Sequence, residues 1–150
     1  MRIVTQRVSE ASVVADGVLT SQIGKGLLIL LGIEHEDSQE DARYLADKIS
    51  MMRIFPDAQD KMNLSVQDIK GDVLVISQFT LHASFKKGNR PSFIRAARPE
   101  HAVPLYEYFI AYLEGELQRP VLSGIFGADM KVSLVNDGPV TIIMDSKLKE

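Results

Sequence analysis

The chain has 150 residues, of which 45% are hydrophobic and 25% are charged, and its net charge at pH 7 is -3. This length is enough for one domain with a buried core, so we expect residues 1–150 to form a single domain. The acidic balance argues against a general nucleic-acid coat protein. The chain has no cysteine, which excludes disulfides and thiolate chemistry, and its three histidines lack ligand spacing, so we predict no metal site.

The apolar runs and the first residues give no membrane or export signal. The longest apolar run, residues 27–31, is too short to span a bilayer. The first seven residues lack the apolar segment of a signal peptide. We therefore expect a cytoplasmic protein with no membrane partner.

The first third of the chain predicts strands followed by a helix. Residues 2–9, 11–15 and 18–23 are rich in strand-forming side chains, and Asp16-Gly17 between the last two is a strong hairpin signal. Residues 27–33 are typical of a buried strand. Ser38 begins a helix that has Asp41 in near capping-box spacing, and the helix ends before Pro56.

The remaining chain alternates between loops and regular elements. Residues 57–70 are polar and loop-like, residues 73–76 are an apolar run typical of a strand buried on both faces, and residues 82–98 form a long connection. A second helix is expected from about residue 99 to 117. Residues 130–135 and 140–144 predict two further strands, joined by a turn at Asp137-Gly138-Pro139.

Polar side chains follow the central strand where it ends. Ser77, Gln78 and Thr80 come directly after the apolar run, on either side of Phe79. Such side chains at the end of a buried strand face a rim where a ligand can bind. The alternative is that they satisfy backbone groups where the strand leaves the sheet.

Positive charge is concentrated in one segment. Residues 86–98 contain five basic residues and no acid, namely Lys86, Lys87, Arg90, Arg95 and Arg98. A basic stretch on an acidic body predicts a local phosphate-binding patch. A solvated loop with spare charge is the alternative.

Several short motifs together resemble one enzyme family. They are Ser77-Gln78-Phe79-Thr80, Asn136-x-Gly138-Pro139-Val140-Thr141, and, between them, Lys87-Gly88-x-Arg90-Pro91-Ser92-Phe93 and Phe126-Gly127-Ala128-x-Met130. The chain resembles the D-aminoacyl-tRNA deacylases, from Arg2-x-Val4-x-Gln6-Arg7-Val8 through Met52-Arg53-Ile54-Phe55 to Asp145-Ser146. The resemblance implies an α+β fold with a mixed, mostly antiparallel sheet or barrel-like β core, two helices packed on it, and a homodimer.

The resemblance also implies a reaction and a way of choosing substrates. The family hydrolyses the ester that joins a D-amino acid, or mischarged glycine, to tRNA, and it needs no cofactor. In the family the Gly-Pro pair, here Gly138 and Pro139, has a cis peptide and enters the partner subunit's pocket. Its carbonyl groups then occupy the space that an L side chain needs. A plain turn between strands is the alternative interpretation.

The implied catalytic residues are Ser77, Gln78, Phe79 and Thr80, with backbone N–H groups near Phe79 and Thr80 holding the developing oxyanion. Thr80 is a nucleophile only with a base, and His82 would share its face if the strand continued. We favour a substrate-assisted reaction in which the ribose 2′-hydroxyl or a water acts.

Substrate contacts are expected from three further parts of the chain. Phe126 and Met130 would line the pocket, although both also suit a core position. Lys86, Lys87, Arg90 and Arg95 would meet acceptor-stem phosphates. Some relatives of the family are associated with DNA-unwinding elements, so a nucleic-acid-binding module without hydrolysis is the alternative. A hydrolase that uses Ser77 and His82 lacks the G-x-S-x-G elbow.

Overall fold

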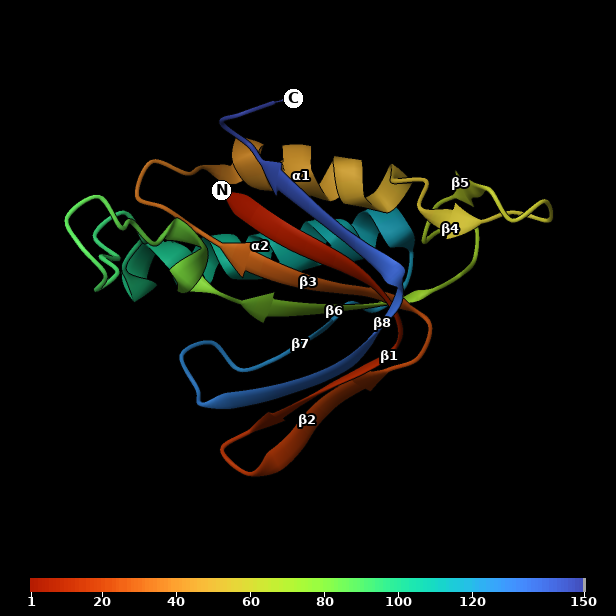
Figure 1. Ribbon diagram of the computed structural model, residues 1–150, viewed down its shortest axis with the longest axis horizontal. Coiled ribbons are helices and arrows are strands. Elements are labelled where there is room, and N and C mark those ends of the chain that lie inside the picture. Colours follow the sequence, from red (N-terminus) through yellow and green to blue (C-terminus); the bar gives the residue numbers. More distant parts are fainter. Residues whose placement is uncertain (150) are drawn as a thin grey trace.

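The computed structural model describes residues 1–149. A curled sheet carries two helices on one side (Figure 1). In chain order the elements are β1 (Arg2–Ala15), β2 (Val18–Ile23), β3 (Gly26–Gly32), α1 (Gln39–Met51), β4 (Phe55–Pro56), β5 (Met62–Leu64), β6 (Asp72–Ser77), the 3-10 turn η1 (Phe79–His82), α2 (Pro99–Leu117), β7 (Leu122–Ser123) and β8 (Met130–Asp145).

Strand β1 organises the sheet because it pairs with three other strands. Residues 2–8 pair with β3, residues 11–15 pair with β2, and β8 runs antiparallel to β1 along nearly its whole length. The sheet continues from β3 to β6 and β7 through parallel pairs, in the order β2-β1-β3-β6-β7. The expected mixed, mostly antiparallel and barrel-like sheet with two helices is therefore confirmed.

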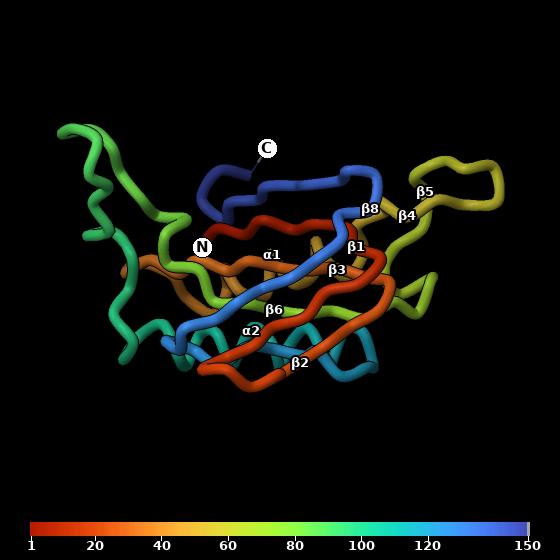
Figure 2. Tube along the Cα trace, turned by 60° about the horizontal axis from the view of Figure 1, so that its bottom comes forward, coloured from red at the N-terminus to blue at the C-terminus, as the bar shows by residue number. Residues whose placement is uncertain are grey.

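Two interruptions that were predicted between strands are not found in residues 1–149. The strands expected at 2–9 and 11–15 are one strand, and the strands expected at 130–135 and 140–144 are also one strand. The expected turn at Asp137–Pro139 does not reverse the chain, since both halves of β8 pair with β1. Register shifts between Gln6, Val8 and Glu10 bend the two strands together (Figure 2). The predicted Asp16-Gly17 hairpin is confirmed, with positive φ at both residues.

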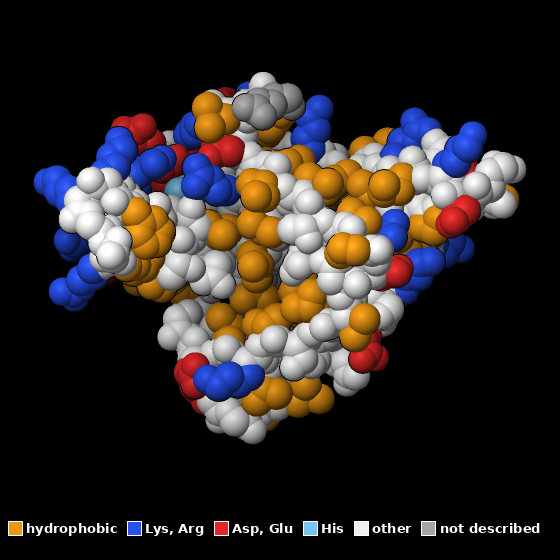
Figure 3. All heavy atoms as spheres, in the orientation of Figure 1, with side chains coloured by type: hydrophobic (Ala, Val, Ile, Leu, Met, Phe, Trp, Pro, Cys, Tyr) orange, Lys and Arg blue, Asp and Glu red, His pale blue; other side chains and the backbone are white. Residues whose placement is uncertain are grey.

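Alternating side chains of the sheet build two cores. Leu27, Ile29 and Leu31 of β3 pack on the helix side with Phe109 of α2, whereas Leu28 belongs to a second cluster inside the curl. Partly buried hydrophobic side chains border this second cluster, namely Leu30, Met130, Val132 and Leu134. Figure 3 shows hydrophobic side chains in the hollow between the upper part of the molecule and its lower flap.

Both predicted helices are confirmed, and each has a local reason to begin where it does. The Asp41 carboxylate accepts a hydrogen bond from the Ser38 backbone N–H at 2.8 Å, which completes the expected capping arrangement of α1. Pro99 is the first residue of α2, where a missing N–H costs nothing. None of the helices within residues 1–149 is both long and apolar enough to cross a membrane. The short strands β4, β5 and β7 were not predicted, because two or three residues give no periodic signal.

Candidate active site

The central strand ends in a helical turn. Ser77 is the last residue of β6 and lies opposite Leu31 of β3. The Gln78 N–H donates to the Leu31 carbonyl at 2.8 Å, which ties the end of β6 to its neighbour. The chain then enters η1, so the stretch after Ser77 does not continue as a strand. The first N–H groups of such a turn, those of Phe79 and Thr80, have no partner inside it.

Three of the predicted residues and Phe126 meet at one cavity. The cavity has a volume of about 60 Å³ and is lined by Leu31, Ile33, Ser77, Gln78, Phe79, Ala97, Ala102 and Phe126. Three consecutive residues at the end of β6 and Phe126, which is distant from them in the sequence, therefore border the same space. Sequence reasoning missed Ile33, Ala97 and Ala102, because small or aliphatic side chains give no signal apart from their place in the fold.

Helix α2 supports the far wall of this cavity. The Tyr106 ring packs edge-on against Phe126, with the ring centroids 5.7 Å apart. The Tyr106 hydroxyl donates a hydrogen bond to the Val75 carbonyl of β6 at 2.9 Å. Burial raises the pKa of Tyr106 to about 12, so this donor stays protonated at neutral pH. The wall is therefore fixed to the strand that leads to Ser77.

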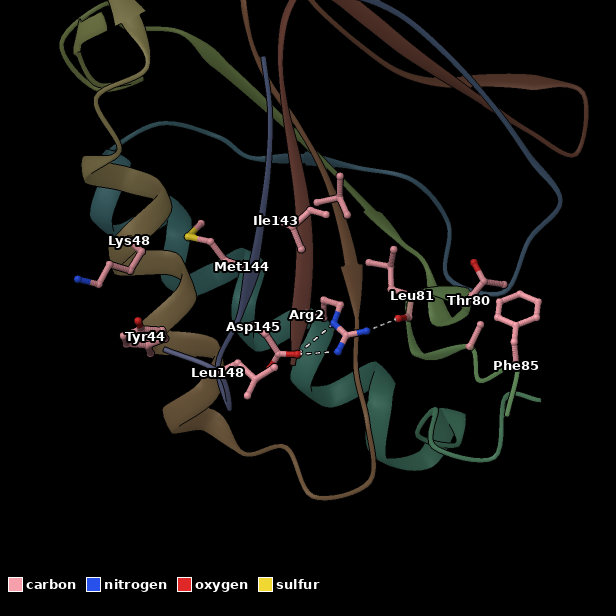
Figure 4. Close-up of a pocket in the computed structure, with 12 residues that line it drawn as sticks. Arg2, Tyr44, Lys48, Thr80, Leu81, Phe85, Ile143, Met144, Asp145 and Leu148 are labelled. Carbon is pink, nitrogen blue, oxygen red and sulfur yellow. Dashed lines mark hydrogen bonds and ion pairs between the residues drawn. The ribbon is translucent and has the colours of Figure 1, made fainter. Parts of the chain in front are cut away.

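Thr80 faces a second and larger hollow. This groove has a volume of about 780 Å³, and Thr80 lies on its rim with Leu81 and Phe85 (Figure 4). The exposed Thr80 hydroxyl accepts a hydrogen bond from the Gln78 side-chain amide. The turn η1 thus separates the small cavity, which Phe79 lines, from the groove, which Thr80 lines.

An ion pair among the residues that line the groove is hydrogen-bonded to η1. Arg2 donates to the Leu81 carbonyl at 2.8 Å and, through two nitrogens, to Asp145 Oδ2 at 2.9 and 3.0 Å (Figure 4). Burial raises the pKa of Asp145, but hydrogen bonds from the Lys147 N–H and Arg2 outweigh it and hold the pKa below its usual range. Asp145 therefore stays ionised at neutral pH and keeps Arg2 in place.

His82 does not face Thr80. Its side chain is buried, whereas Thr80 is exposed, because the helical turn sends the two residues in different directions. The ring nitrogen Nδ1 lies 3.6 Å from the Glu34 carboxylate. The pairing of Thr80 with His82, which required a continued strand, is therefore not formed.

The Gly138-Pro139 peptide is cis, as the resemblance implied, and lies in an exposed bend of β8. Asn136 brackets the bend: its side-chain oxygen accepts from the Val140 N–H at 2.8 Å, and its amide donates to the Thr141 hydroxyl at 3.0 Å. Arg7 donates to the Asp137 carbonyl at 2.9 Å.

Arg7 also connects the bend to a third motif of the resemblance. Its guanidinium donates to the Ile54 carbonyl at 2.6 Å, after the end of α1. Segments around residues 7, 54 and 137 are therefore joined by one side chain. This role of Arg7 was not predicted, because its partners are distant in the sequence.

The bend and the cavity lie at opposite ends of the sheet within one chain. Arg7, which contacts the bend, pairs with Leu27 of β3, whereas Arg2, beside η1, pairs with Gly32. Five residues of extended strand span roughly 17 Å. One copy of the chain therefore does not bring Gly138 and Pro139 to the cavity.

The basic residues Lys87 and Arg90 are exposed on a hairpin that begins beside the cavity. Ser84 and Ser92 exchange two backbone hydrogen bonds of 2.9 Å, which close the hairpin. Phe93 then packs edge-on against Phe79, with the ring centroids 5.1 Å apart. Met130 lies elsewhere, against the second core inside the curl, and does not line the small cavity.

Comparison with known proteins identifies the family. The sequence pattern described as D-Tyr-tRNA(Tyr) deacylase matches residues 4–145. The chain belongs to this deacylase family. Its relatives include proteins named D-aminoacyl-tRNA deacylase from Flavobacterium johnsoniae, 61% identical, and Akkermansia muciniphila, 63% identical, each over 100% of both chains. The resemblance that the motifs implied is confirmed.

Two solved structures share the deacylase-family fold. One, described as a c-Myc DNA unwinding element binding protein, is 40% identical, covers 97% of this chain and 98% of its own, and has a TM-score of 0.91. The other, described as a probable eukaryotic D-amino acid tRNA deacylase, is 16% identical with a TM-score of 0.81, covers 95% and 97%, and supports the fold alone.

Proposed function

We propose that the chain hydrolyses the ester bond of D-aminoacyl-tRNA, and of glycine mischarged on tRNA, releasing the free amino acid and tRNA. The observation that carries this proposal is the meeting of Ser77, Gln78, Phe79 and Phe126 at one cavity in a chain of the deacylase family. The family pattern matches nearly the whole chain, so residues 1–150 act as one deacylase domain in the cytoplasm, where charged tRNA is used.

The reaction needs a held carbonyl and a placed nucleophile rather than a reactive side chain. The Phe79 and Thr80 N–H groups, at the start of η1 beside the cavity that Phe79 lines, hold the oxyanion that develops on the ester carbonyl. A water, assisted by the ribose 2′-hydroxyl, attacks the carbonyl carbon, the bond to the ribose oxygen breaks, and that oxygen takes a proton. Ser77 and Gln78 orient the end of the strand. No cofactor takes part.

Chiral selection is proposed to come from a second copy of the chain. Gly138 and Pro139 enter the partner's cavity, and their carbonyl groups fill the space that an L side chain needs. A D side chain points outward, and glycine has none to reject. The separation of roughly 17 Å along β3 supports action between subunits, because one chain alone leaves the cavity without this wall.

The large groove supports a homodimer. Three hydrophobic side chains at its border are well exposed, namely Ile143 at 68%, Leu148 at 65% and Phe85 at 62%. Exposed hydrophobic side chains that border one groove are typical of a surface that another protein covers. A second copy that covers this groove also reaches η1, which separates the groove from the cavity.

Contacts with tRNA are proposed for the basic hairpin. Lys87 and Arg90 are exposed, and the Phe93–Phe79 contact joins their hairpin to the cavity. Phosphate contacts position RNA without reading its sequence, which suits an enzyme that accepts many tRNAs. Phe126 lines the pocket for the aminoacyl group.

The test is deacylation of D-Tyr-tRNA and L-Tyr-tRNA at one enzyme concentration, with Thr80→Ala alongside. We expect rapid loss of the D ester, sparing of the L ester, and an active Thr80→Ala variant, because the Thr80 hydroxyl has no base beside it. An inactive but folded Thr80→Ala variant would assign the nucleophile to Thr80 instead.

The second candidate function is nucleic-acid binding without hydrolysis. It is favoured by the 40% identity to a protein described as binding a DNA unwinding element. Binding of RNA or DNA with no loss of either ester would select this candidate, and the basic hairpin would then be the site to mutate first.

A further inference from the structure

His82 is a buried polar side chain that the proposed reaction does not use. The residue is 1% exposed, and within residues 1–149 neither ring nitrogen has a hydrogen-bond partner. Buried polar groups in proteins nearly always have partners. The nearest charged atom is Oε2 of Glu34, 3.6 Å from Nδ1, which is too long for a hydrogen bond.

The same carboxylate oxygen is already occupied by an exposed cation. Arg95 Nη2 donates to Glu34 Oε2 at 2.8 Å. The Arg95 side chain is 58% exposed, whereas that of Glu34 is 13% exposed. One oxygen therefore faces both a buried imidazole, which ends η1, and a guanidinium at the surface.

We propose that Arg95, Glu34 and His82 form a relay that couples a phosphate bound at Arg95 to the position of η1. His82 is the positioning residue of this relay. The proposal rests on the proposed function, because the phosphate is that of the tRNA backbone. A phosphate that binds Arg95 competes with Glu34 for the guanidinium. Glu34 Oε2 then accepts a hydrogen bond from His82 Nδ1.

The new contact acts on the residues that hold the substrate. His82 is the last residue of the turn that begins at Phe79, so a shorter distance to Glu34 fixes the turn at its far end. Within residues 1–149, Arg2 of β1 also contacts this turn, since it donates to the Leu81 carbonyl, and it is paired with Asp145. Asp145 stays ionised at neutral pH.

The direct test is an NMR titration of the three histidine rings, with His82→Asn to assign the His82 signal. In Arg95→Gln the midpoint of the His82 titration moves to higher pH, because Glu34 is no longer neutralised. In Glu34→Gln it moves to lower pH. Arg119→Gln, which removes an exposed ion pair with Asp72, leaves it unchanged. An unmoved His82 midpoint in Arg95→Gln would overturn the relay.

The source of the phosphate is tested in the same spectra. In one experiment the probe is an RNA hairpin that carries no amino acid and has an acceptor-like stem and a single-stranded 3′ end. In the other experiment the probe is inorganic phosphate. The RNA moves the His82 midpoint to higher pH in the wild type and not in Arg95→Gln. A shift with inorganic phosphate alone would make the site one for free phosphate. Equal shifts in both proteins, or none with either probe, would contradict coupling through Arg95.

Deacylation kinetics of two His82 variants distinguish a role of His82 in positioning η1 from a role in packing alone. In His82→Phe, which keeps a ring but loses the donor, we expect kcat for D-Tyr-tRNA to fall roughly 10- to 100-fold with KM retained. In His82→Asn the amide donor reaches Glu34, so kcat recovers without the pH dependence that a titrating ring gives. A thermal melt controls for folding. Equal losses in both folded variants would contradict the proposal. Absent deacylation in the wild type would contradict the proposed function, and the titrations would still decide the relay.

Discussion

At the scale of single residues, the Gly138-Pro139 bend depends on side chains that bracket it. Asn136, before the bend, hydrogen-bonds to Val140 and Thr141 after it, and Arg7 holds the Asp137 carbonyl. Gly138 has φ of +138°, a conformation that L side chains rarely adopt, and a Cβ there would lie 2.8 Å from a Val140 methyl group. The sequence identified the motif, but it did not identify Arg7 as its support, because that contact joins residues far apart in the chain.

The change Gly138→Ala tests whether the bend determines the preference for D-aminoacyl over L-aminoacyl esters. A Cβ at this position displaces the tip, so we expect the preference for D-Tyr-tRNA over L-Tyr-tRNA to fall roughly 10-fold or more. The measurement is the ratio of the two initial deacylation rates. Gly17→Ala is the control, since its positive φ carries the same kind of backbone strain but a Cβ there meets nothing within 4 Å. An unchanged ratio in Gly138→Ala would remove the bend from substrate selection.

At the scale of elements, η1 is where the sequence was least informative. The apolar run predicted β6, and the polar residues after it predicted a rim. A four-residue turn has no periodicity of its own, so the sequence did not show whether the strand continued to His82, and the structure shows that it does not. The turn packs so closely on β3 that a Cβ at Gly32 would lie 2.9 Å from the Gln78 carbonyl oxygen.

Gly32→Ala should therefore displace η1 and lower activity. The new methyl group also meets Leu81 and His82 at 3.0 and 3.1 Å, so the turn moves as a unit. We expect kcat for D-Tyr-tRNA to fall roughly 100-fold, with the fold retained by circular dichroism. Gly115→Ala in α2, where a Cβ meets nothing within 4 Å, should keep full activity and gain about 0.5–1 kcal/mol of stability. Full activity in Gly32→Ala would show that the position of η1 does not matter.

The start of α1 gives a prediction with a defined pH dependence. Burial raises the pKa of Asp41, but hydrogen bonds from Ser146, Lys147 and Ser38 outweigh it and hold the pKa well below its usual range. Because the folded pKa lies below the unfolded value of about 3.9, this stabilisation is present above that pH and is lost as the pH falls through the folded pKa.

Asp41→Asn should accordingly cost about 1 kcal/mol of unfolding free energy at pH 7. The difference from wild type should be smaller at pH 2, because the stabilisation by the carboxylate is lost progressively as the pH falls below about 3.9. Urea unfolding at both pH values measures it. Asp129→Asn, which removes an ion pair exposed on both sides, should stay within about 0.5 kcal/mol at either pH. An equal cost at both pH values would assign the effect to shape rather than charge.

At the scale of the whole molecule, local sequence patterns predicted the two helices and most of the strands, whereas the mixed, barrel-like sheet was expected only from the family resemblance. The hairpin at Asp16-Gly17 and the helix bounds at Ser38 and Pro99 follow from local chemistry. The continuous strands β1 and β8 depend on register shifts between segments about 130 residues apart, which no local window contains. The candidate site likewise was predicted only where it depends on a local motif. Ser77, Gln78 and Phe79 of that motif line the cavity, whereas its aliphatic walls are brought together only by the fold.

The proposed arrangement places Gly138 and Pro139 of one chain in the cavity of the other. It is tested by mixing Gly138→Ala subunits with an excess of Phe79→Pro subunits, after dissociation and reassociation. Phe79→Pro removes an N–H proposed to hold the oxyanion, and the first position of a helical turn accepts proline. The measured quantity is the ratio of D-Tyr-tRNA to L-Tyr-tRNA deacylation. We predict that the mixture regains the wild-type preference, because each active cavity then receives an intact bend from its partner. A ratio equal to that of Gly138→Ala alone would contradict completion of the cavity by the partner chain.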